Sequence, residues 1–490
     1  MWNSHTRPSK GHNKNLEDKL KSSWPLLNPF TNSEIDRIHL MALRILQDIG
    51  VRVDNENARV ILKQAGAIVD DDSNIVQLPP DLIDLALESA PSDIYLYEAS
   101  GREMPCRAGV NYMGTQGYAA NFYDPNQDRL RTPDENDVAQ WARLADYLSD
   151  VRIVQPITQN ASMKPVESAL RMARTVVLNT RKHYLAQPLE VEEAEIWFDL
   201  SNIIAQGDEV KRKGLVTFMA TCISPYQLDA TNTALLMLAA QREIPVAFFS
   251  GALAGATGPV TLAGILAQQN AEVLFALVLS QLTKPEAPFI YGMASSIIDL
   301  RSGNSLYAPI EYSLLKVASG QLSRYYHLPF YSALSMADSA SIDVQNGAEK
   351  ALTVLLTLLS GANFTSGGGN LATASTAAYE QLVIDHEIYR MVKRFVRGIE
   401  ISEETLAWDA FLRVGIGGSF LSDKHTIDWM RSGEHFLPHI TNRNGVRGES
   451  MLKRAHSVVE HVLSDHQVNI PDTVVDEVNT YVNKRLSQLV

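Results

Sequence analysis

Hydrophobic residues in the first part of the chain recur at helical spacing. Between about residues 31 and 90, a stripe such as Ile35, Ile38, Ala42 and Ile45 predicts an amphipathic helix, and Gly50 is a typical helix end. Two further helices and two short extended segments follow before residue 90. This region carries no chemical motif, so we expect a compact N-terminal cap whose function is structural.

After this region the pattern changes to short apolar strands that alternate with amphipathic helices. The predicted strands are Val110–Met113, Arg152–Gln155, His183–Ala186, Leu215–Met219, Pro245–Phe249, Pro288–Tyr291, Pro329–Ser332 and Asn363–Thr365. The predicted helices are Glu135–Leu148, Pro165–Asn179, Glu190–Ile204, Ala230–Arg242, Pro259–Leu282, Ile310–Tyr325, Gln345–Leu359 and Ala374–Val396. Repeated strand–helix units predict an α/β fold of the (β/α)8 TIM-barrel type. A doubly wound open sheet is the competing architecture, but no G-x-G-x-x-G motif follows the first strand.

The first repeat contains an irregular stretch. Tyr118–Tyr123 and Arg129–Arg131 flank a turn rich in Asp, Pro and Asn, which predicts a β-hairpin. Thr132 and Glu135 have the spacing of a capping box for the next helix. We expect the hairpin to lie over the barrel mouth. Four residues would then reach the site: Tyr112, Gln116, Phe122 and Tyr123.

These patterns divide the chain into four parts. Residues 1–28 are polar and basic without periodicity, which predicts a disordered arm; docking of the arm on a neighbouring subunit is the alternative. An N-terminal α/β cap would span 29–105, the barrel 106–400 and a helical extension 401–490. The extension includes a glycine-rich loop near Gly417 and two terminal helices.

Composition excludes several classes of protein. Apolar residues make up 45% and charged residues 20%, as in globular proteins, and the net charge of −13 argues against nucleic-acid binding. Cys106 and Cys222 are too few for a disulfide framework and fit a reducing cytoplasm. The longest apolar stretch, Ala271–Leu282, contains Glu272 and predicts a buried helix, not a membrane span. We therefore expect a cytoplasmic protein without nucleic-acid or membrane partners, and apolar helices compatible with a homo-oligomer.

Motifs for several common chemistries are missing from the sequence. It contains no P-loop, HExxH, GxSxG or CxxC, which leaves phosphoryl transfer, zincin and α/β-hydrolase chemistry without support. A zinc site would have to combine Cys106, Cys222 and a distant histidine, and no usual ligand spacing is present. We expect no metal site.

Neutral polar and aromatic residues follow the predicted strands, where ligands bind in parallel α/β folds. A single aromatic residue is most often core packing, but a ring of aromatic faces at strand ends suits a cation without donatable protons, such as a quaternary ammonium group. Glycines after the last strand would let backbone approach a ligand closely. The candidate substrate-binding residues are Tyr112, Gln116, Gln155, Gln187, Ser224, Tyr226, Ser250, Tyr291, Ser332, Gly368 and Gly369.

Four stretches carry a resemblance to a known family. They are Gly255–Gly264 (GATGPVTLAG) with the following QQNAEVL, Asp338-Ser339 followed by Asp343 and Glu349, Ala378–Asp385 (AYEQLVID), and the glycine-rich Gly415–Leu421 with His425-Thr426. Together they resemble the trimethylamine methyltransferase family. That family includes pyrrolysine-bearing enzymes and a larger branch without pyrrolysine, among them glycine betaine methyltransferases. The segment Ser332–Met336, where a pyrrolysine enzyme would carry the special residue, contains ordinary amino acids, so the chain is similar to the second branch.

The resemblance implies a reaction and its participants. A methyl group would pass from a quaternary amine, such as glycine betaine or a related betaine, to Co(I) of a corrinoid carried by a partner protein, and no tightly bound cofactor is expected. The implied catalytic residues are Asp338, Ser335 and His425. Asp343 could instead simply cap the next helix. Asp385 and Glu387 could be no more than part of a solvated helix face.

Two other functions stay open from the residues alone. The first is a non-catalytic protein that binds or senses quaternary ammonium compounds on the same barrel. The second is a barrel lyase or aldolase, which would need a Schiff-base lysine at a strand end. Lys182 precedes its strand and so lies at the wrong end.

Overall fold

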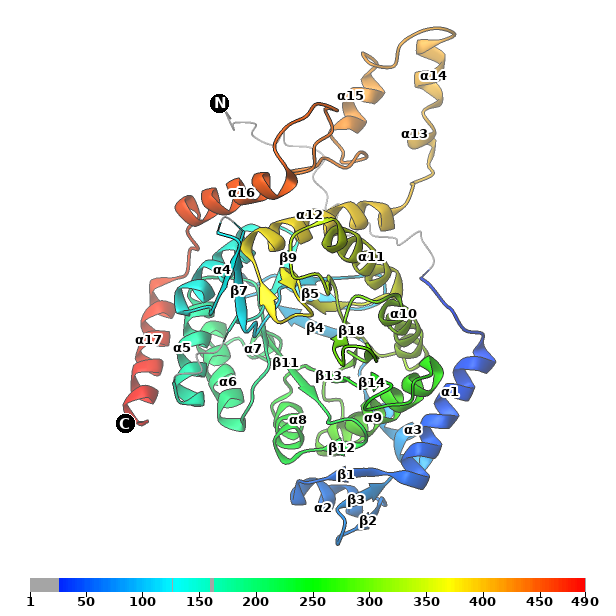
Figure 1. Ribbon diagram of the computed structural model, residues 1–490, viewed down its shortest axis with the longest axis vertical. Coiled ribbons are helices and arrows are strands. Elements are labelled where there is room, and N and C mark those ends of the chain that lie inside the picture. Colours follow the sequence, from blue (N-terminus) through cyan, green and yellow to red (C-terminus); the bar gives the residue numbers. More distant parts are fainter. Residues whose placement is uncertain (1–25, 126, 159–162, 490) are drawn as a thin grey trace. The chain divides into compact units, whose positions relative to one another are not determined.

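A ring of eight parallel strands forms the centre of the computed structural model, which describes residues 26–125, 127–158 and 163–489 (Figure 1). The strands are β6 (Met113–Gly114), β9 (Val151–Val154), β10 (His183–Ala186), β11 (Val216–Thr221), β13 (Val246–Ser250), β15 (Phe289–Met293), β18 (Phe330–Ala333) and β19 (Phe364–Ser366). Bridges from Tyr112 to Phe364 and from Thr115 to Gly368 join the last strand to the first. A side chain at Gly114 would collide with the carbonyl oxygen of Thr365, so the closure needs glycine there.

Helices surround this ring and connect its strands (Figure 1). They are α4 (Glu135–Tyr147), α5 (Pro165–Val177), α6 (Val191–Ala205), α7 (Glu209–Lys213), α8 (Ala230–Arg242), α9 (Leu262–Thr283), α10 (Ile310–Tyr325), α11 (Val344–Ser360) and α12 (Tyr379–Arg397). The predicted (β/α)8 barrel is confirmed. The predicted helix from Ala374 begins too early, because Thr376–Ala377 forms a short strand, β21, before α12.

A hairpin fills the amino-terminal end of the barrel. Strands β4 (Ile94–Tyr97) and β5 (Glu103–Cys106) pair antiparallel, and Leu96 and Met104 pack in one buried cluster with Ile153 of the barrel wall. Tyr97 N–H donates to the carbonyl of Gly214, just before β11. With this end filled, a ligand site within the barrel is expected at the carboxyl ends of the strands.

The N-terminal cap covers helix α9. It comprises α1 (Asn32–Arg44) with a π-helical last turn to Ile49, α2 (Glu56–Gln64), α3 (Pro80–Ser89), β1 (Val51–Val53), β2 (Ile68–Asp70) and β3 (Ile75–Gln77). Helix α9 packs on β13 and β15 with one side and on α1 and α3 with the other, which explains why it is apolar all round. By length and composition it is the one described helix that could cross a membrane, but 83% of its apolar window is buried in the protein.

Two small sheets lie after the barrel strands. One consists of β14 (Leu253–Ala254), β16 (Ser296–Ile298) and β17 (Ser305–Leu306). The other combines β7 (Asn121–Asp124), β8 (Arg129–Arg131), β20 (Asn370–Leu371) and β21. Strands β7 and β8 form the predicted hairpin. The predicted capping box at Thr132 and Glu135 is wrong: α4 begins at Glu135, so Asp134 is the cap and Asp137 its partner.

The remaining C-terminal residues are helical. Residues 393–436 form a unit of their own, with α13 (Glu403–Leu406), α14 (Trp408–Val414) and α15 (Lys424–Met430). Helices α16 (Met451–Asp465) and α17 (Asp472–Ser487) belong to the barrel unit and pack on α4 and on α5 and α6, respectively. Most of the predicted N-terminal arm, residues 1–25, lies outside the described residues. At its end, Leu27 N–H donates to the carbonyl of Leu359.

Candidate functional site

The inner face of the barrel near the carboxyl ends of the strands carries amides, a phenol and a phenyl ring. Counting in steps of two from the buried Ile153, Leu185 and Ala247 leads to Gln155, Gln187 and Phe249 as the next side chains on this face. Gln187 and Phe249 are half-buried although their strand neighbours are buried, so both reach the open end. Gln155 packs on Met219, with 3.9 Å from its Nε2 to the sulfur.

An aromatic cluster lies at the same level. The Phe249 and Tyr331 ring centroids are 5.9 Å apart, and Tyr331 lies 6.0 Å from Phe364. Gly292 stands between Phe249 and Tyr331 in the sheet register, and a side chain there would collide with Phe249. The two rings can approach each other because that position has no side chain.

The phenol of Tyr331 is anchored within this cluster. Its oxygen lies 2.8 Å from the hydroxyl of Ser366 on β19. Burial raises the pKa of Tyr331 to about 12, so the phenol stays neutral at physiological pH. The cluster therefore presents neutral rings and a polar hydroxyl pair. We call Gln155, Gln187, Phe249, Tyr331 and Ser366 the rim site.

Two predicted site residues, Ser224 and Ser250, bind a buried carboxylate that the sequence analysis did not select. The Glu272 side chain of α9 accepts hydrogen bonds from the Ser250 hydroxyl at 2.5 Å and from the Ser224 hydroxyl at 2.8 Å. It also accepts the backbone N–H of Tyr226 at 3.0 Å. Cys222 donates its thiol to the same carboxylate at 3.3 Å, and burial raises the pKa of this thiol well above its usual value.

This network holds the loop after β11 to α9. Its five donors, counting the Gln268 amide at 3.1 Å, satisfy the carboxylate within the protein. Tyr226 is half-buried beside it, with its pKa raised by burial and then by Glu272. Ser224, Tyr226 and Ser250 are thus brought together, outside the rim site.

Two predicted aromatic residues lie within packed regions of the barrel. Tyr112 belongs to the same buried cluster as Tyr331 and Phe364, but its hydroxyl donates to the carbonyl of Pro105 in β5 at 3.3 Å, so it points to the end that the β4–β5 hairpin fills. Tyr291 is fully buried, and its hydroxyl donates to Asn270 of α9 at 3.1 Å, so it points away from the barrel interior. The structure does not bring Tyr112, Tyr226, Tyr291 and Asp338 into one shared cavity.

The hairpin residues and the glycine run pack within the protein. Phe122 lies 4.4 Å from the ring of Tyr379, and the Tyr123 hydroxyl donates to Asp128 at 3.0 Å in the hairpin itself. Gly367 N–H donates to Thr115, Gly368 N–H to Gly114 and Gly369 N–H to the Asp385 carboxylate. These bonds occupy the three backbone N–H groups of the glycine run within the protein.

Gln116 spans the space between two loops. Its amide donates to the carbonyl of Gly117 at 2.7 Å and to that of Ala374 at 3.1 Å. Ser332 and Ser335 are fully buried in and after β18, and neither hydroxyl has a hydrogen-bond partner. Asn160, another residue at a predicted strand end, lies outside the described residues.

The acidic residues after β18 have distinct roles. Asp343 caps α11 by accepting the Asn346 N–H at 2.9 Å, which confirms the capping interpretation. Asp338 accepts the backbone N–H groups of Tyr307 and Ala308 at 2.8 and 3.1 Å. It is half-buried.

The helix after β19 does not present the solvated acidic face that we considered for Asp385 and Glu387. Both side chains are fully buried. Asp385 pairs with Lys350 at 2.9 Å, and Glu387 pairs with Arg390 at 3.0 Å and accepts backbone N–H groups from residues 439–441. The solvated-face interpretation is wrong because loops and α11 cover this side of α12.

His425, the third predicted catalytic residue, belongs to the unit of residues 393–436. Its Nε2 lies 3.2 Å from the carbonyl of Glu404, and its ring is 5.8 Å from that of Trp429. These contacts are all within that unit.

A buried lysine near the end of β18 was missed by the sequence analysis. Lys316 of α10 donates to the carbonyl of Ala333 at 2.6 Å and to the hydroxyl of Thr357 at 3.1 Å. Burial lowers its pKa well below the usual value, and Lys350 lowers it further. Its complete burial leaves no surface for a carbonyl substrate, which a Schiff-base mechanism would require.

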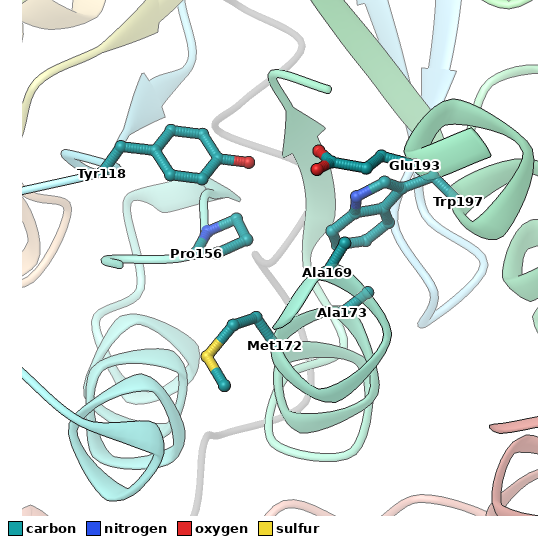
Figure 2. Close-up of a pocket in the computed structure, with 7 residues that line it drawn as sticks. All are labelled: Tyr118, Pro156, Ala169, Met172, Ala173, Glu193 and Trp197. Carbon is teal, nitrogen blue, oxygen red and sulfur yellow. The ribbon is translucent and has the colours of Figure 1, made fainter. Parts of the chain in front are cut away.

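A small, partly open cavity lies beside the loop after β9. Figure 2 shows the Tyr118 hydroxyl and the Glu193 carboxylate facing each other across it, with Pro156, Met172 and Trp197 in its wall. It has room for about one water molecule, too little for a methylated amine. Within the described ranges, no three His, Cys, Asp or Glu side chains lie together as metal ligands would.

A filled (β/α)8 barrel with convergent polar and aromatic side chains beyond its strand ends is the architecture of barrel enzymes. The family model described as trimethylamine methyltransferase (MTTB) matches residues 3–490. The chain belongs to the trimethylamine methyltransferase family.

Two relatives found by sequence agree with this assignment. Trimethylamine methyltransferase MttB of Methanosarcina barkeri (strain Fusaro / DSM 804) is 33% identical over 94% of this chain and 95% of its own length. Glycine betaine methyltransferase of Desulfitobacterium hafniense (strain Y51) is 28% identical over 95% of this chain and 97% of its own length. Among solved structures, Methanosarcina barkeri monomethylamine methyltransferase aligns over 92% of this chain and 93% of that chain, with 13% identity and a TM-score of 0.49. The chain is a methyltransferase, which disfavours the sensing and lyase alternatives.

Proposed function

We propose that the chain transfers a methyl group from a quaternary amine, glycine betaine or a related betaine, to a corrinoid bound to a separate protein. Family membership supports methyl transfer. One named relative is a methyltransferase for trimethylamine, a tertiary amine, and another is a methyltransferase for glycine betaine. Within the chain, the observation that carries the choice is the aromatic pair Phe249 and Tyr331 on the inner face of the barrel, with ring centroids 5.9 Å apart and Phe249 only half-buried.

Aromatic faces bind a quaternary ammonium group through their negative quadrupole, without needing a proton donor. Phe249 is half-buried and therefore available from the open end, and Gly292, between Phe249 and Tyr331 in the sheet register, lets the two rings approach each other. Gln187 and the Tyr331–Ser366 hydroxyl pair offer hydrogen bonds for a carboxylate such as that of a betaine.

The chemistry of a quaternary amine matches a rim site made of neutral groups. When a methyl carbon leaves a quaternary nitrogen, the electron pair of the C–N bond stays on nitrogen and a neutral tertiary amine departs. No general acid is required for this step. The residues of the rim site then need only hold the methyl group in line with its acceptor and exclude water.

The acceptor is a second substrate that arrives with its carrier protein. The reduced cobalt of a corrinoid supplies the nucleophile. The described rim offers no cluster of metal-ligating side chains, so this metal would come with its own ligands.

A panel of betaines, mixed with this protein, a reduced corrinoid protein and a reductant, tests the proposal. We expect the cobalt absorbance spectrum to change on methylation with at least one betaine and not with trimethylamine. Loss of every response across the panel would contradict it.

Replacement of Phe249 tests how the cation is held. We expect Phe249→Leu to weaken betaine binding by about 2- to 30-fold, the range of one cation–π contact. Binding of 3,3-dimethylbutyrate, in which an uncharged tert-butyl group replaces the trimethylammonium group of glycine betaine, should change much less. Calorimetry with both ligands gives the comparison.

Phe248 offers a matched control one residue away. It is fully buried and stacks on Phe289 at 6.3 Å on the outer side of the barrel wall. Phe248→Leu should lower stability but leave the ratio of the two affinities unchanged. Equal weakening of both ligands in Phe249→Leu would argue against an aromatic cation site.

A further inference from the structure

Asp338 joins three loops at the open end of the barrel. Its Oδ1 accepts hydrogen bonds from the Tyr307 N–H at 2.8 Å and the Thr373 hydroxyl at 3.2 Å, and its Oδ2 accepts the Ala308 N–H at 3.1 Å. Tyr307 and Ala308 follow β17, Asp338 follows β18, and Thr373 lies in the tip of the β20–β21 hairpin. Both carboxylate oxygens therefore serve protein donors.

The hairpin tip is strained. Ala372, Thr373 and Ala374 have φ angles of 49°, 56° and 64°, a left-handed conformation that residues with a Cβ seldom adopt in succession. Such strain persists only where surrounding contacts over-determine it, and it gathers at functional sites.

Contacts with the segment around Asp338 hold this tip in place. Ala372 N–H donates to the carbonyl of Ser339 and Thr373 N–H to that of Ala337, both at 2.9 Å. Gln116 adds its bond to the carbonyl of Ala374. The Asp338 carboxylate also bonds to the tip, through the Thr373 hydroxyl. The same carboxylate holds the Tyr307 N–H, so it connects the tip to the loop after β17.

Tyr307 lies in the second loop that the Asp338 carboxylate holds. It is half-buried, and its ring meets that of Tyr312 edge-on at 5.7 Å. Burial and then the Asp338 charge raise the pKa of Tyr307. Beyond Tyr312, the Lys316 Nζ lies 4.6 Å from the centroid of the Tyr312 ring and donates to the carbonyl of Ala333, which is on β18 two residues after Tyr331. Packing therefore connects the ring of Tyr307 to the strand that carries Tyr331 of the rim site, and Asp338 holds the backbone of Tyr307.

The segment that carries Asp338 is itself fixed from α11. The Glu349 carboxylate accepts the N–H groups of Asp338 and Ser339 at 2.9 and 3.2 Å. Thr353 accepts the Met336 N–H at 3.2 Å. The Asp338 carboxylate thus projects from a segment fixed by α11 towards the two loops.

We propose that Asp338 is a positioning residue, which fixes Tyr307 and the Ala372–Ala374 turn against each other and so sets how tightly the rim holds its methylated amine. The ligand part of this inference rests on the proposed function. Asp338 acts through the loops and does not contact the reacting atoms.

Hydrogen exchange tests the positioning without any substrate. In Asp338→Asn, one acceptor oxygen becomes an NH2 group facing backbone donors, so peptides covering residues 305–308 and 371–376 should exchange about ten-fold faster or more. Asp229→Asn is the matched control, because Asp229 caps α8 by accepting the Asn232 N–H at 2.9 Å and bonds neither to the two loops nor to the segment around Asp338; it should leave both peptides unchanged. Unchanged exchange in Asp338→Asn overturns the proposal, whether or not the protein transfers methyl groups to a corrinoid.

Kinetics tests the consequence for binding. Asp338→Asn should raise the KM for the active betaine about ten-fold or more and change kcat much less. Thr373→Val, which keeps the carboxylate, should also raise KM. The double variant should raise KM by less than the product of the two single effects, because both substitutions remove the Asp338–Thr373 hydrogen bond. A fall in kcat with unchanged KM would place Asp338 at the reacting atoms, and full additivity would separate the two residues; either result overturns the proposal. If the wild type transfers no methyl group, the proposed function fails, and the exchange experiment still decides the role of Asp338.

Discussion

At the scale of single residues, several polar side chains in this barrel are buried with defined partners. His183, the first residue of β10, is one of them: its Nδ1 lies 3.2 Å from the carbonyl of Tyr97 and its Nε2 2.9 Å from the hydroxyl of Thr217. It links the hairpin at the closed end to the barrel wall. Burial lowers its pKa to about 4, so the folded protein keeps this imidazole neutral.

This burial predicts acid sensitivity. The pKa of His183 is about 4 in the folded protein and near 6.5 in the unfolded chain. Above pH 6.5 both states hold the imidazole neutral, so the histidine does not change the free energy of unfolding. As the pH falls from 6.5 towards about 4, only the unfolded chain takes up the proton, and the folded state is progressively destabilised. For a pKa near 4, the loss at pH 5 is about 2 kcal/mol. Urea unfolding at pH 7 and pH 5 measures it, and His183→Gln should show a correspondingly smaller decrease between the two pH values. An equal decrease in both proteins would show that His183 does not set the acid limit.

Residue roles at the barrel wall could be predicted only in part from sequence. Strand ends were located well enough to select Gln155, Gln187 and Ser250. The side to which each residue points could not be predicted, because parallel barrel strands are buried on both faces and lack a polar alternation. Tyr291 was selected but points towards α9, whereas Phe249 and Tyr331 point inward and were not selected. The carboxylate of Glu272 could have been suspected from its place in an otherwise apolar helix.

At the scale of elements, one face of α11 fixes the irregular segment after β18. Lys350 donates to the carbonyl of Ser335 at 2.9 Å, and Thr357 donates to the carbonyl of Leu334 at 3.3 Å. Lys350 is also paired with Asp385 of α12, and both side chains are fully buried. Burial raises the pKa of Asp385 and lowers that of Lys350, while each partner opposes the shift of the other. The pair therefore ties α11, α12 and the segment after β18 together.

Removal of one member of this pair should destabilise the protein strongly. Lys350→Met leaves the Asp385 carboxylate buried without its cation, which costs about 3–5 kcal/mol in comparable pairs. Denaturant unfolding measures the change in free energy. The double variant Lys350→Met/Asp385→Leu should recover part of this lost stability. Recovery is incomplete because the Gly369 N–H then lacks its acceptor. Lys63→Met is the matched control, since the Lys63–Asp71 pair is exposed and its loss should have little effect. Similar effects of Lys350→Met and Lys63→Met would contradict the assignment.

At the scale of the whole barrel unit, the architecture was predictable because strand and helix signals repeat along the chain. What repetition could not show is which helix lies under the N-terminal cap. Helix α9 packs on the strands and beneath α1 and α3, so the cap supplies the second wall of a helix that is apolar all round. Without that wall, α9 would expose an apolar surface of the kind that promotes aggregation.

A charge on the buried face of α1 tests this dependence. Ala42 is fully buried in α1, whereas Leu40, two residues earlier, is 60% exposed. We expect Ala42→Asp to place an unpaired carboxylate in an apolar contact, lower stability by about 3 kcal/mol or more and increase the binding of a hydrophobic dye. Leu40→Asp adds the same charge to the same helix on its solvent side and should leave both properties nearly unchanged. If the two variants behave alike, the cap does not stabilise the barrel through α9, and α9 must be covered in another way.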